Sequence, residues 1–574
     1  MNKVLLLCAA VVVASCASVR WGGAASMAEE KFPSRAEVAK LLARPPVLDV
    51  AKVSADPVEE WELVGPFPDT LTATPVRAES AWEKALVSAN PAFAQALTED
   101  HRCIAREVAR YVAAKQKSYP GHSLERFIES RCATTAKDVH LRSLTGTVPK
   151  NVTEEKWLEE WKADLAKMAK LDGADLAGIA VAREGDSAAL IIATSEAGAI
   201  FAKPVPVVAK GLTTVELRGR LGRGGAYRIG AVINQGELGS EECHPLDATS
   251  PPEFAFSCTV KAGDTRAAVE IGAFDEGRIL GRKVVDFVVF PTGEAPKKWS
   301  RPKGSQNVPE GLFAARFLAE VNAFRQRAGL GMLTEAKDQS ATAALLAPHY
   351  FAASFGQTDP LDGDLVALAM MAGWDVPLEK VSSHFGGEWM SGTRDLGLFL
   401  EFVLDSPFQR QALTDPRATH IGLGAVDSPG ALGVLFATYV PLPKFDRKEA
   451  EIAIITRLNT LRLERSLPLA QWTLWPEDEG QVIEAQLAAH RWGPADASQH
   501  ALEKTAAVAK GRVRGYLQLV DDLDHFQFPP EVLLRPDINV FLAVATYKGE
   551  DWAQTRYVVC FVLASKGDIE TASR

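Results

Sequence analysis

The spacing of hydrophobic and polar residues changes several times along the chain and predicts a series of different domains. Between residues 56 and 204, apolar residues recur mostly every three or four positions, as in "HRCIAREVARYVAAKQ". That period is typical of amphipathic helices. The segment ends in two apolar runs around Arg183-Glu184-Gly185-Asp186, which is a hairpin signal. We therefore expect a helix-rich domain over 56–204 that ends in a β-hairpin.

Residues 205–293 have a different spacing of apolar residues. Short apolar runs such as "AYRIGAVINQG" and "KVVDFVVFP" alternate with Gly, Pro or charged turns. Turns at that frequency predict a small β-sandwich. The next segment, 294–311, is polar and rich in Pro and Gly, so it is expected to be a linker.

Residues 312–443 return to helices followed by strands. "GLFAARFLAEVNAFRQRAGL" is amphipathic, and "DLGLFLEFVLD" is a second strong helix that Ser406-Pro407 interrupts. "THIGLGAV" and "ALGVLFATYV" then predict two strands. Gly422 and Gly424 alternate with apolar residues, so both glycines fall on one face of the first strand and leave room for a close neighbour.

The segment 446–566 repeats parts of this pattern. Asn459 and Arg462 follow Asn322 and Arg325 at a constant interval of 137 residues, and Pro536 follows Pro416 at an interval of 120. Internal similarity of this kind indicates a duplicated unit. The alternative is chance similarity between two α/β units.

Composition fits several ordinary globular domains. The chain has 574 residues, of which 47% are hydrophobic and 24% charged, and its net charge is −10. A length of this size implies three or four domains. The negative charge and the absence of a basic cluster argue against nucleic acid as a partner.

The first residues carry an export signal. "MNKVLLLCAAVVVASCAS" has a lysine, an apolar run too short to cross a bilayer comfortably, and then small residues. Its end, Val13 to Cys16, resembles the lipobox of bacterial lipoproteins. This resemblance implies that 1–16 is a lipoprotein signal peptide with its lipobox, that cleavage leaves Cys16 as the first residue, and that Cys16 is acylated. The protein would then bind the membrane through lipid chains. Ala17, rather than Asp, is expected to send it to the outer membrane or cell surface, with 17–55 as a tether. A plain cleaved signal peptide is the alternative.

The cysteines agree with export. Cys103 pairs plausibly with Cys132, and Cys243 with Cys258, since each pair is local and an oxidising compartment favours disulfides. Cys560 lies in an apolar run and is expected to be a buried free thiol.

The segment 312–443 resembles the CAP superfamily of cysteine-rich secretory, antigen 5 and pathogenesis-related proteins. The resemblance rests on Asn322-x-x-Arg325, "GGEW" and "DSPFQRQALTDPRATHIGLGAV". It implies a three-layer α/β/α sandwich with a central cavity. By extension, 446–566 would be a degenerate CAP-like copy, and 56–204 is a candidate third copy.

Many members of that superfamily hold a divalent metal with two His and two Glu. Carried over by motif, Glu388 is the one ligand that survives. Gln357, Ser406 and Val434 stand where the other three would be. One carboxylate cannot complete a zinc site, so we expect neither a metal nor a cofactor.

Two further residues belong to the candidate cavity. His384, four residues before Glu388, is a substitute ligand if the segment is helical and otherwise a loop histidine. Arg410 is expected to bond carbonyls at a helix end or to pair with Asp415.

Three functions compete on this basis. The first is an envelope lipoprotein that binds an extracellular lipid, glycan or protein in the CAP cleft without catalysis. The second is a hydrolase or metal-dependent enzyme with a remodelled cavity; Ser406, His384 and Glu388 would be its triad. The third is a purely structural envelope protein. The depleted ligand set favours the first.

Overall fold

The computed structural model describes residues 32–565 apart from short gaps. The gaps are 50–57, 72–73, 116–118, 137–138, 223–225, 227, 237–238, 247–248, 262, 276–277, 279, 303–306, 392, 429–430, 510–512 and 550–552. Cys16 and the predicted signal peptide lie outside the described residues. The described chain forms two compact units. The larger comprises 33–377 with 384–439, and the smaller comprises residue 32 with 378–383 and 440–565.

The first domain of the larger unit packs helices on an antiparallel sheet of order β3-β5-β4. The β4–β5 hairpin turns at Gly185, whose φ of 63° suits glycine, as the sequence predicted. β3 was not predicted. The elements of this first domain are α2 (Ala81–Ala89), α3 (Phe93–Ala96), α4 (Glu99–Ala114), α5 (His122–Arg131), β3 (His140–Thr147), α6 (Glu154–Met168), β4 (Leu176–Glu184) and β5 (Ser187–Ser195).

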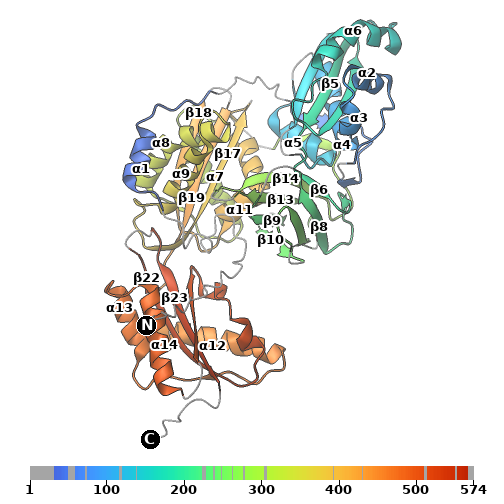
Figure 1. Cartoon of the computed structure of the whole chain (residues 1–574). Coiled ribbons are helices and arrows are strands. Elements are labelled where there is room, and N and C mark those ends of the chain that lie inside the picture. The colour runs from blue at the N-terminus through green and yellow to red at the C-terminus, as the bar shows by residue number, and fades with distance from the viewer. Residues whose placement is uncertain are drawn as a thin grey trace, which may run out of the picture. The chain divides into compact units, whose positions relative to one another are not determined.

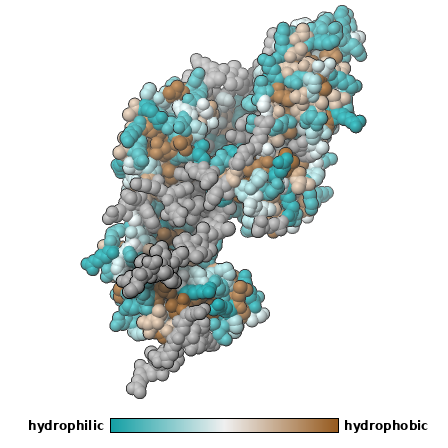
Figure 2. All heavy atoms as spheres, in the orientation of Figure 1, coloured by the Kyte–Doolittle hydropathy of each residue, from teal (hydrophilic) through white to brown (hydrophobic). Residues whose placement is uncertain are grey.

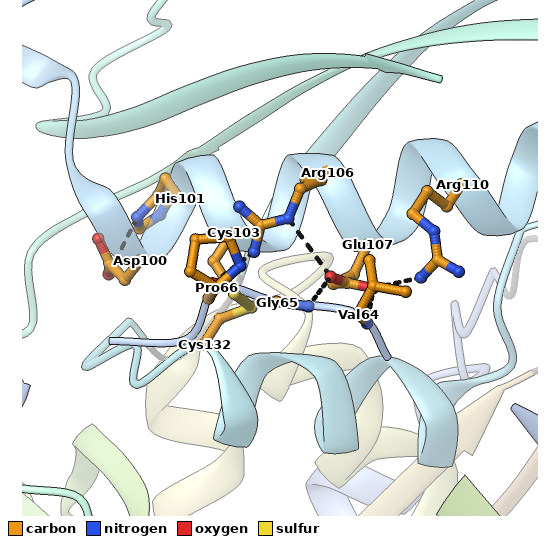
Figure 3. The surroundings of a disulfide bond; sticks show 10 residues. All are labelled: Val64, Gly65, Pro66, Asp100, His101, Cys103, Arg106, Glu107, Arg110 and Cys132. Carbon is orange, nitrogen blue, oxygen red and sulfur yellow. Dashed lines mark hydrogen bonds and ion pairs between the residues drawn. A yellow bond between two sulfur atoms is a disulfide. The ribbon is translucent and has the colours of Figure 1, made fainter. Parts of the chain in front are cut away.

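A disulfide between Cys103 and Cys132 joins α4 to the end of α5 and confirms the predicted pairing (Figure 3). One turn further along α4, the buried Glu107 accepts hydrogen bonds from the backbone N–H groups of Val64 and Gly65 at 3.3 and 3.1 Å. Arg110 donates to the same carboxylate at 2.8 Å. The helix is therefore fixed to the preceding segment by a charged side chain whose partners are satisfied.

Residues 199–289 form the predicted β-sandwich. Two four-stranded sheets, β10-β9-β13-β14 and β11-β12-β8-β6, bury one shared apolar core. The Cys243–Cys258 disulfide, also as predicted, lies within it. The strands are β6 (Ala199–Phe201), β8 (Thr214–Leu221), β9 (Arg228–Gln235), β10 (Gly239–Glu242), β11 (His244–Pro245), β12 (Glu253–Thr259), β13 (Ala267–Phe274) and β14 (Arg282–Val289).

Two strand pairs connect distant segments of this unit. They are β1 (Glu60–Glu62) with β15 (Lys298–Ser300), and β2 (Thr70–Leu71) with β7 (Val205–Pro206). Part of the predicted tether is helical: α1 (Arg35–Leu42) begins with a capping box at Ser34 and Glu37. Part of the predicted linker forms β15. Both segments gain structure from contacts with distant residues; Arg44, just after α1, pairs with Asp362 at 2.6 Å.

The segment after residue 312 wraps helices around a sheet of order β16-β18-β19-β17 (Figure 1). Its elements are α7 (Phe313–Arg327), β16 (Thr334–Glu335), α8 (Lys337–Ser354), α9 (Pro360–Ala372), β17 (Lys380–Ser391), α10 (Leu396–Asp405), α11 (Pro407–Thr414), β18 (His420–Ser428) and β19 (Ala431–Pro441). A side chain on Gly424 would meet the backbone of α8, and one on Gly386 would meet Gln409 of α11. Helices therefore pack on both faces of the sheet.

Between α11 and β18 the chain turns from a helix into a strand, and we call this turn the helix-to-strand corner. The sequence predicted a helix followed by a strand at this place. Ser406 ends α10, and Pro407 begins α11 at a position where proline is tolerated. A Cβ on Gly424 would lie 2.2 Å from the carbonyl oxygen of Ala343. The bare face of β18 is thus required by the backbone of α8, and no space is left beside Gly424 for a ligand.

The smaller unit has a sheet of the same strand pattern, β20-β22-β23-β21. Its elements are α12 (Arg447–Glu464), β20 (Gln471–Trp472), α13 (Glu479–Ala488), α14 (Pro494–Val508), β21 (Val513–Val520), the 3₁₀ turns η2 (Leu523–His525) and η3 (Pro530–Leu533), β22 (Ile538–Tyr547) and β23 (Arg556–Ser565). The buried free thiol of Cys560 lies in β23.

The parallel strand pairs set the correspondence between the two sheets. Thr334 pairs with His420 in one sheet, and Gln471 pairs with Asn539 in the other. The interval between His420 and Asn539 is 119 residues, one fewer than the sequence interval of 120 at Pro416. Phe541 therefore corresponds to Gly422.

The face of the molecule seen in Figure 2 is mainly hydrophilic. Figure 2 shows apolar residues on one face of the molecule in small groups between hydrophilic ones. No described helix combines the length and the apolar character that crossing a bilayer requires.

Candidate functional site

The predicted cavity residues do not converge on one point. Gln357 lies after α8 on the surface, where its side chain exchanges hydrogen bonds with the backbone of Asp49 at 2.7 and 3.0 Å. His384 lies on β17 and contacts Asp415. Ser406, Arg410 and Glu388 lie close to the β-sandwich. The structure therefore brings three of the five residues to one surface.

Ser406 makes the central contact of that surface. Its hydroxyl donates to Glu270 Oε2 on β13 of the sandwich at 2.8 Å, and both side chains are buried. Lys283 Nζ on β14 lies 3.6 Å from Glu270 Oε1 and 3.3 Å from Asp286 Oδ2. Arg126 of α5 pairs with Asp286. We call Arg126, Glu270, Lys283, Asp286, Glu388 and Ser406 the junction cluster.

The charges of the junction cluster shift one another's pKa values. Burial, reinforced by the nearby charges of Asp286 and Glu388, raises the pKa of Glu270 to about 7 against the pull of Lys283. Burial also opposes ionisation of Asp286, but Arg126 and Lys283 outweigh it and lower its pKa to about 2. Of the two sandwich carboxylates, Asp286 is therefore ionised near neutral pH, whereas Glu270 titrates there.

Glu388 is half-buried on β17. Burial lowers the pKa of Lys283, yet the carboxylates of Glu270, Asp286 and Glu388 together raise it well above the ordinary lysine value. Glu388 thus acts on the same ammonium group as the sandwich carboxylates. The part of β17 where the cleft was predicted therefore lies within electrostatic reach of the charged residues of the sandwich.

His384 is held away from Ser406 by another partner. Its Nε2 atom lies 2.9 Å from Asp415 Oδ2, and both side chains are nearly inaccessible to solvent. Burial raises the pKa of Asp415, but the bonds and charges of His384 and Arg417 overcome this and lower it well below the ordinary value. Since His384 lies on a strand, the helical spacing that would have made it a substitute ligand beside Glu388 is absent.

Arg410 bonds carbonyls, which is the first of its two predicted roles. Its Nε atom donates to Leu404 O at 2.6 Å, at the end of α10, and Nη1 donates to Gly236 O of the sandwich at 3.1 Å. Burial lowers its pKa to about 10. Arg410 therefore fastens the α10–α11 corner to the turn after β9.

The described residues contain no group of three or more His, Cys, Asp or Glu placed to hold a metal ion. The junction cluster itself mixes two cations with three carboxylates. Its arrangement suits internal charge pairing, because each carboxylate already faces a cation or a hydroxyl.

Sequence reasoning missed the sandwich half of this cluster. A signal was present: Glu270 and Asp286 each interrupt an apolar run, in "AAVEIGAF" and "VVDFVV". A charged residue that faces a protein interior requires a partner. That observation predicts a buried ion pair, although it does not identify the partner.

A second missed arrangement lies in the first domain. His101 Nε2 is 2.7 Å from Ser195 Oγ, and His101 Nδ1 is 3.1 Å from Asp100 Oδ2 (Figure 3 shows Asp100 and His101). The pattern is that of a serine hydrolase triad. All three residues are at most 3% exposed, and a Cβ on Gly178 of β4 would lie 2.1 Å from the backbone of His101. No substrate reaches such a position, so the bonds tie α4 to β5.

Comparison with known proteins adds little. No protein-family model matches the chain, and no curated protein matches it. Three of the solved structures that resemble it each have a TM-score of 0.17. An extracellular protein containing an SCP domain from Bacillus anthracis has 12% identity and covers 43% of this chain and 86% of its own.

A cysteine-rich secretory protein from Staphylococcus aureus has 13% identity and covers 51% of this chain and 97% of its own. Na-ASP-1 has 7% identity and covers 52% of this chain and 72% of its own. At such a TM-score and identity the likeness assigns neither a family nor a function, so both rest on the residues themselves.

Proposed function

We propose that this chain is an exported, lipid-anchored envelope protein that binds an extracellular ligand without catalysis. It would be built on two CAP-like units, each a three-layer α/β/α sandwich, of which 446–566 is a degenerate copy. Helices on both faces of the first sheet and a common strand order in the two sheets support this architecture. The two disulfides fit an oxidising, exported compartment.

One observation favours binding over catalysis by Ser406: the serine is buried at the contact with the neighbouring β-sandwich, where its hydroxyl donates to the buried Glu270. A serine nucleophile needs a base within hydrogen-bond reach and access for a substrate. The imidazole of His384 is instead bonded to Asp415, and Ser406 is buried. The triad of Ser406, His384 and Glu388 is therefore not assembled.

The C-terminal end of β17 offers a surface for an extracellular ligand. Trp389, the residue after Glu388, packs edge-on against Phe355 with ring centroids 5.4 Å apart. Phe355 is 44% exposed. Aromatic rings that are rigid and partly exposed suit contact with a glycan, a lipid or an apolar protein side chain.

Metal analysis of the purified full chain tests the choice between binding and catalysis. We expect the wild type to hold less than one metal ion per chain. We also expect Ser406→Ala to show the same background hydrolase activity as the wild type. Stoichiometric zinc that is lost in Glu388→Ala and retained in Gln357→Ala would favour the metal-dependent enzyme instead. Gln357 is a suitable control because its side chain bonds only a surface segment.

Fractionation of cells tests the anchor. Cys16→Ser is expected to move the protein from the membrane to the soluble fraction, since the acylated cysteine is the proposed link to lipid. Continued partitioning of the variant into detergent would contradict the lipid anchor while leaving the binding proposal intact.

A further inference from the structure

The loop between α8 and α9 holds Gln357 in a fixed position. The backbone N–H of Gly356 donates to Ala353 O at 3.0 Å, and Gly356 has a φ of 67°. The backbone N–H of Gln357 donates to Ala352 O at 2.8 Å. These two bonds form a Schellman motif, a common way for a helix to end at a glycine. Gln357 is therefore an exposed residue on a well-defined turn.

The side chain of Gln357 binds the backbone of Asp49 through both of its polar atoms. Oε1 accepts from the N–H of Asp49 at 3.0 Å, and Nε2 donates to the carbonyl oxygen of Asp49 at 2.7 Å. The N–H and C=O groups of one residue point in the same direction when that residue is extended, as in a pair of antiparallel strands. Gln357 thus binds an extended peptide backbone, and the two bonds do not involve the side chain of Asp49.

A second contact fixes the same segment five residues earlier. Arg44 Nη2 donates to Asp362 Oδ1, in the first turn of α9, at 2.6 Å. The side chain of Asp362 is 13% exposed and that of Arg44 is 55% exposed. Pro45 and Pro46 follow Arg44, and their restricted φ angles favour an extended chain. The start of α9 therefore offers a largely covered carboxylate to an arginine that precedes an extended segment.

Few contacts hold the segment 44–49 on this loop. Residues 43–47 and Asp49 are all exposed, and Val47 is 61% exposed. Exposed ion pairs and hydrogen bonds contribute little to stability, because water competes for the same groups. The segment gains instead from its high local concentration, since it belongs to the same chain. A second polypeptide with the same groups can displace it once its own concentration is high enough.

We propose that the α8–α9 loop is a binding site for an extended polypeptide, which residues 44–49 occupy until a partner segment of the same chemistry displaces them. The partner carries an arginine for Asp362 and, five residues later, an extended residue for Gln357. The site adjoins the proposed ligand surface, because Phe355 precedes Gln357 by two residues. This inference rests on the proposed function, of which it names the class of ligand, a protein. It also names the regulation, because the chain blocks its own site.

Fluorescence anisotropy with the purified full chain and a labelled peptide of the sequence of residues 43–50 tests this proposal. Apparent affinity falls with the fraction of chains whose site is blocked. Arg44→Glu removes the ion pair of the chain's own segment and leaves Gln357 and Asp362 unchanged. We therefore expect this variant to bind the peptide at least about fivefold more tightly than the wild type. Lys40→Glu is the matched control: it makes the same charge change at an exposed position of α1 and should bind as the wild type does.

Two further changes, made with the Arg44→Glu chain, test recognition of the backbone. Adding Gln357→Ala should weaken peptide binding about tenfold, because both hydrogen bonds to the backbone are lost. A peptide that is N-methylated at the position of Asp49 should also bind weakly, because it lacks the N–H group although it keeps every side chain.

A circular dichroism melt establishes that Arg44→Glu folds, and since Arg44 is exposed we expect an unchanged midpoint. The proposal is overturned if no chain binds the peptide, if the wild type and Arg44→Glu bind it equally, or if the N-methylated peptide binds as well as its parent. The proposed function would survive those results with a glycan or a lipid as ligand, whereas stoichiometric zinc would count against the proposed function alone.

Discussion

Arg325 and Arg462, 137 residues apart, make equivalent hydrogen bonds in two separate parts of the chain. Arg325 donates through Nε to Gly331 O, and through its two terminal nitrogens to the carbonyls of Leu413, Asp415 and Ala418. Arg462 donates through Nε to Pro468 O, and through its terminal nitrogens to the carbonyls of Val532, Arg535 and Pro536. Both guanidinium groups are fully buried.

Each arginine therefore ties the loop after its own helix to the loop that precedes a central strand. Asn322 and Asn459 reinforce this, since each accepts a hydrogen bond from a backbone N–H eleven residues later, at 2.7 and 2.8 Å. Two sequence positions that recur at a fixed interval thus do the same structural work twice, which is the main support for a duplicated unit.

Replacing either arginine by lysine should destabilise its own unit. A lysine has three N–H donors on a single nitrogen, whereas each arginine reaches four carbonyls through three nitrogens, so buried oxygens would lose their partners. We expect Arg325→Lys and Arg462→Lys each to lower the free energy of unfolding by about 3 kcal/mol in urea titrations. Equal stability of wild type and variants would mean that the loops are held by other contacts.

The glycine at position 424 should tolerate no side chain. Its Cβ would lie 2.2 Å from the carbonyl oxygen of Ala343, a backbone atom that cannot rotate away. We expect Gly424→Ala to lower the free energy of unfolding by about 2 kcal/mol, the usual cost of forcing atoms into a packed interior. The matched control is Gly331→Ala, because nothing lies within 4 Å of the position that a Cβ would take there.

Gly331→Ala should leave the stability unchanged or raise it by roughly 0.5 kcal/mol through the unfolded state. If Gly424→Ala and Gly331→Ala change the free energy of unfolding equally, the loss at position 424 comes from the conformational freedom of glycine and not from contact with α8.

Local patterns were sufficient to predict the elements that depend on neighbours in sequence. The break at Ser406-Pro407, the β4–β5 turn at Gly185 and the two local disulfides all follow from residues close together in the chain. Arg325 was identified by its spacing from Asn322. Its hydrogen bonds to backbone carbonyls were not predicted, because these partners lie up to 93 residues away.

The candidate site depended on contacts that no local pattern contains. The partner of Ser406 is 136 residues distant, on a strand of another domain. His384 was assigned to the cavity by its distance from Glu388 along the chain, but it meets Asp415 because β17 runs beside the helix-to-strand corner. Pairings of this kind are fixed by tertiary packing, so the sequence predicts that Glu270 needs a partner without identifying Ser406 or Lys283.

Glu270 should make the stability of the larger unit depend on pH. In the folded chain its pKa is about 7, because burial and the charges of Asp286 and Glu388 disfavour the carboxylate. An unfolded glutamate has a pKa near 4.3. Above that value the unfolded chain releases the proton while the folded chain keeps it, so the contribution of Glu270 to stability falls as pH rises and is lost once pH passes about 7.

Glu270→Gln carries no titrating carboxyl and still offers an oxygen to Ser406. We therefore expect the variant to gain on the wild type as pH rises from 5 to 8, by up to about 3 kcal/mol in the free energy of unfolding, if the full shift is realised. Urea titrations of both proteins at several pH values measure this difference.

Asp286→Asn is the contrasting change: burial opposes ionisation of Asp286, yet Arg126 and Lys283 keep it charged, so its loss should destabilise the unit at pH 5 and at pH 8 alike. A difference between wild type and Glu270→Gln that does not vary with pH would mean that Lys283 keeps Glu270 ionised, and that the junction cluster is a fixed set of ion pairs.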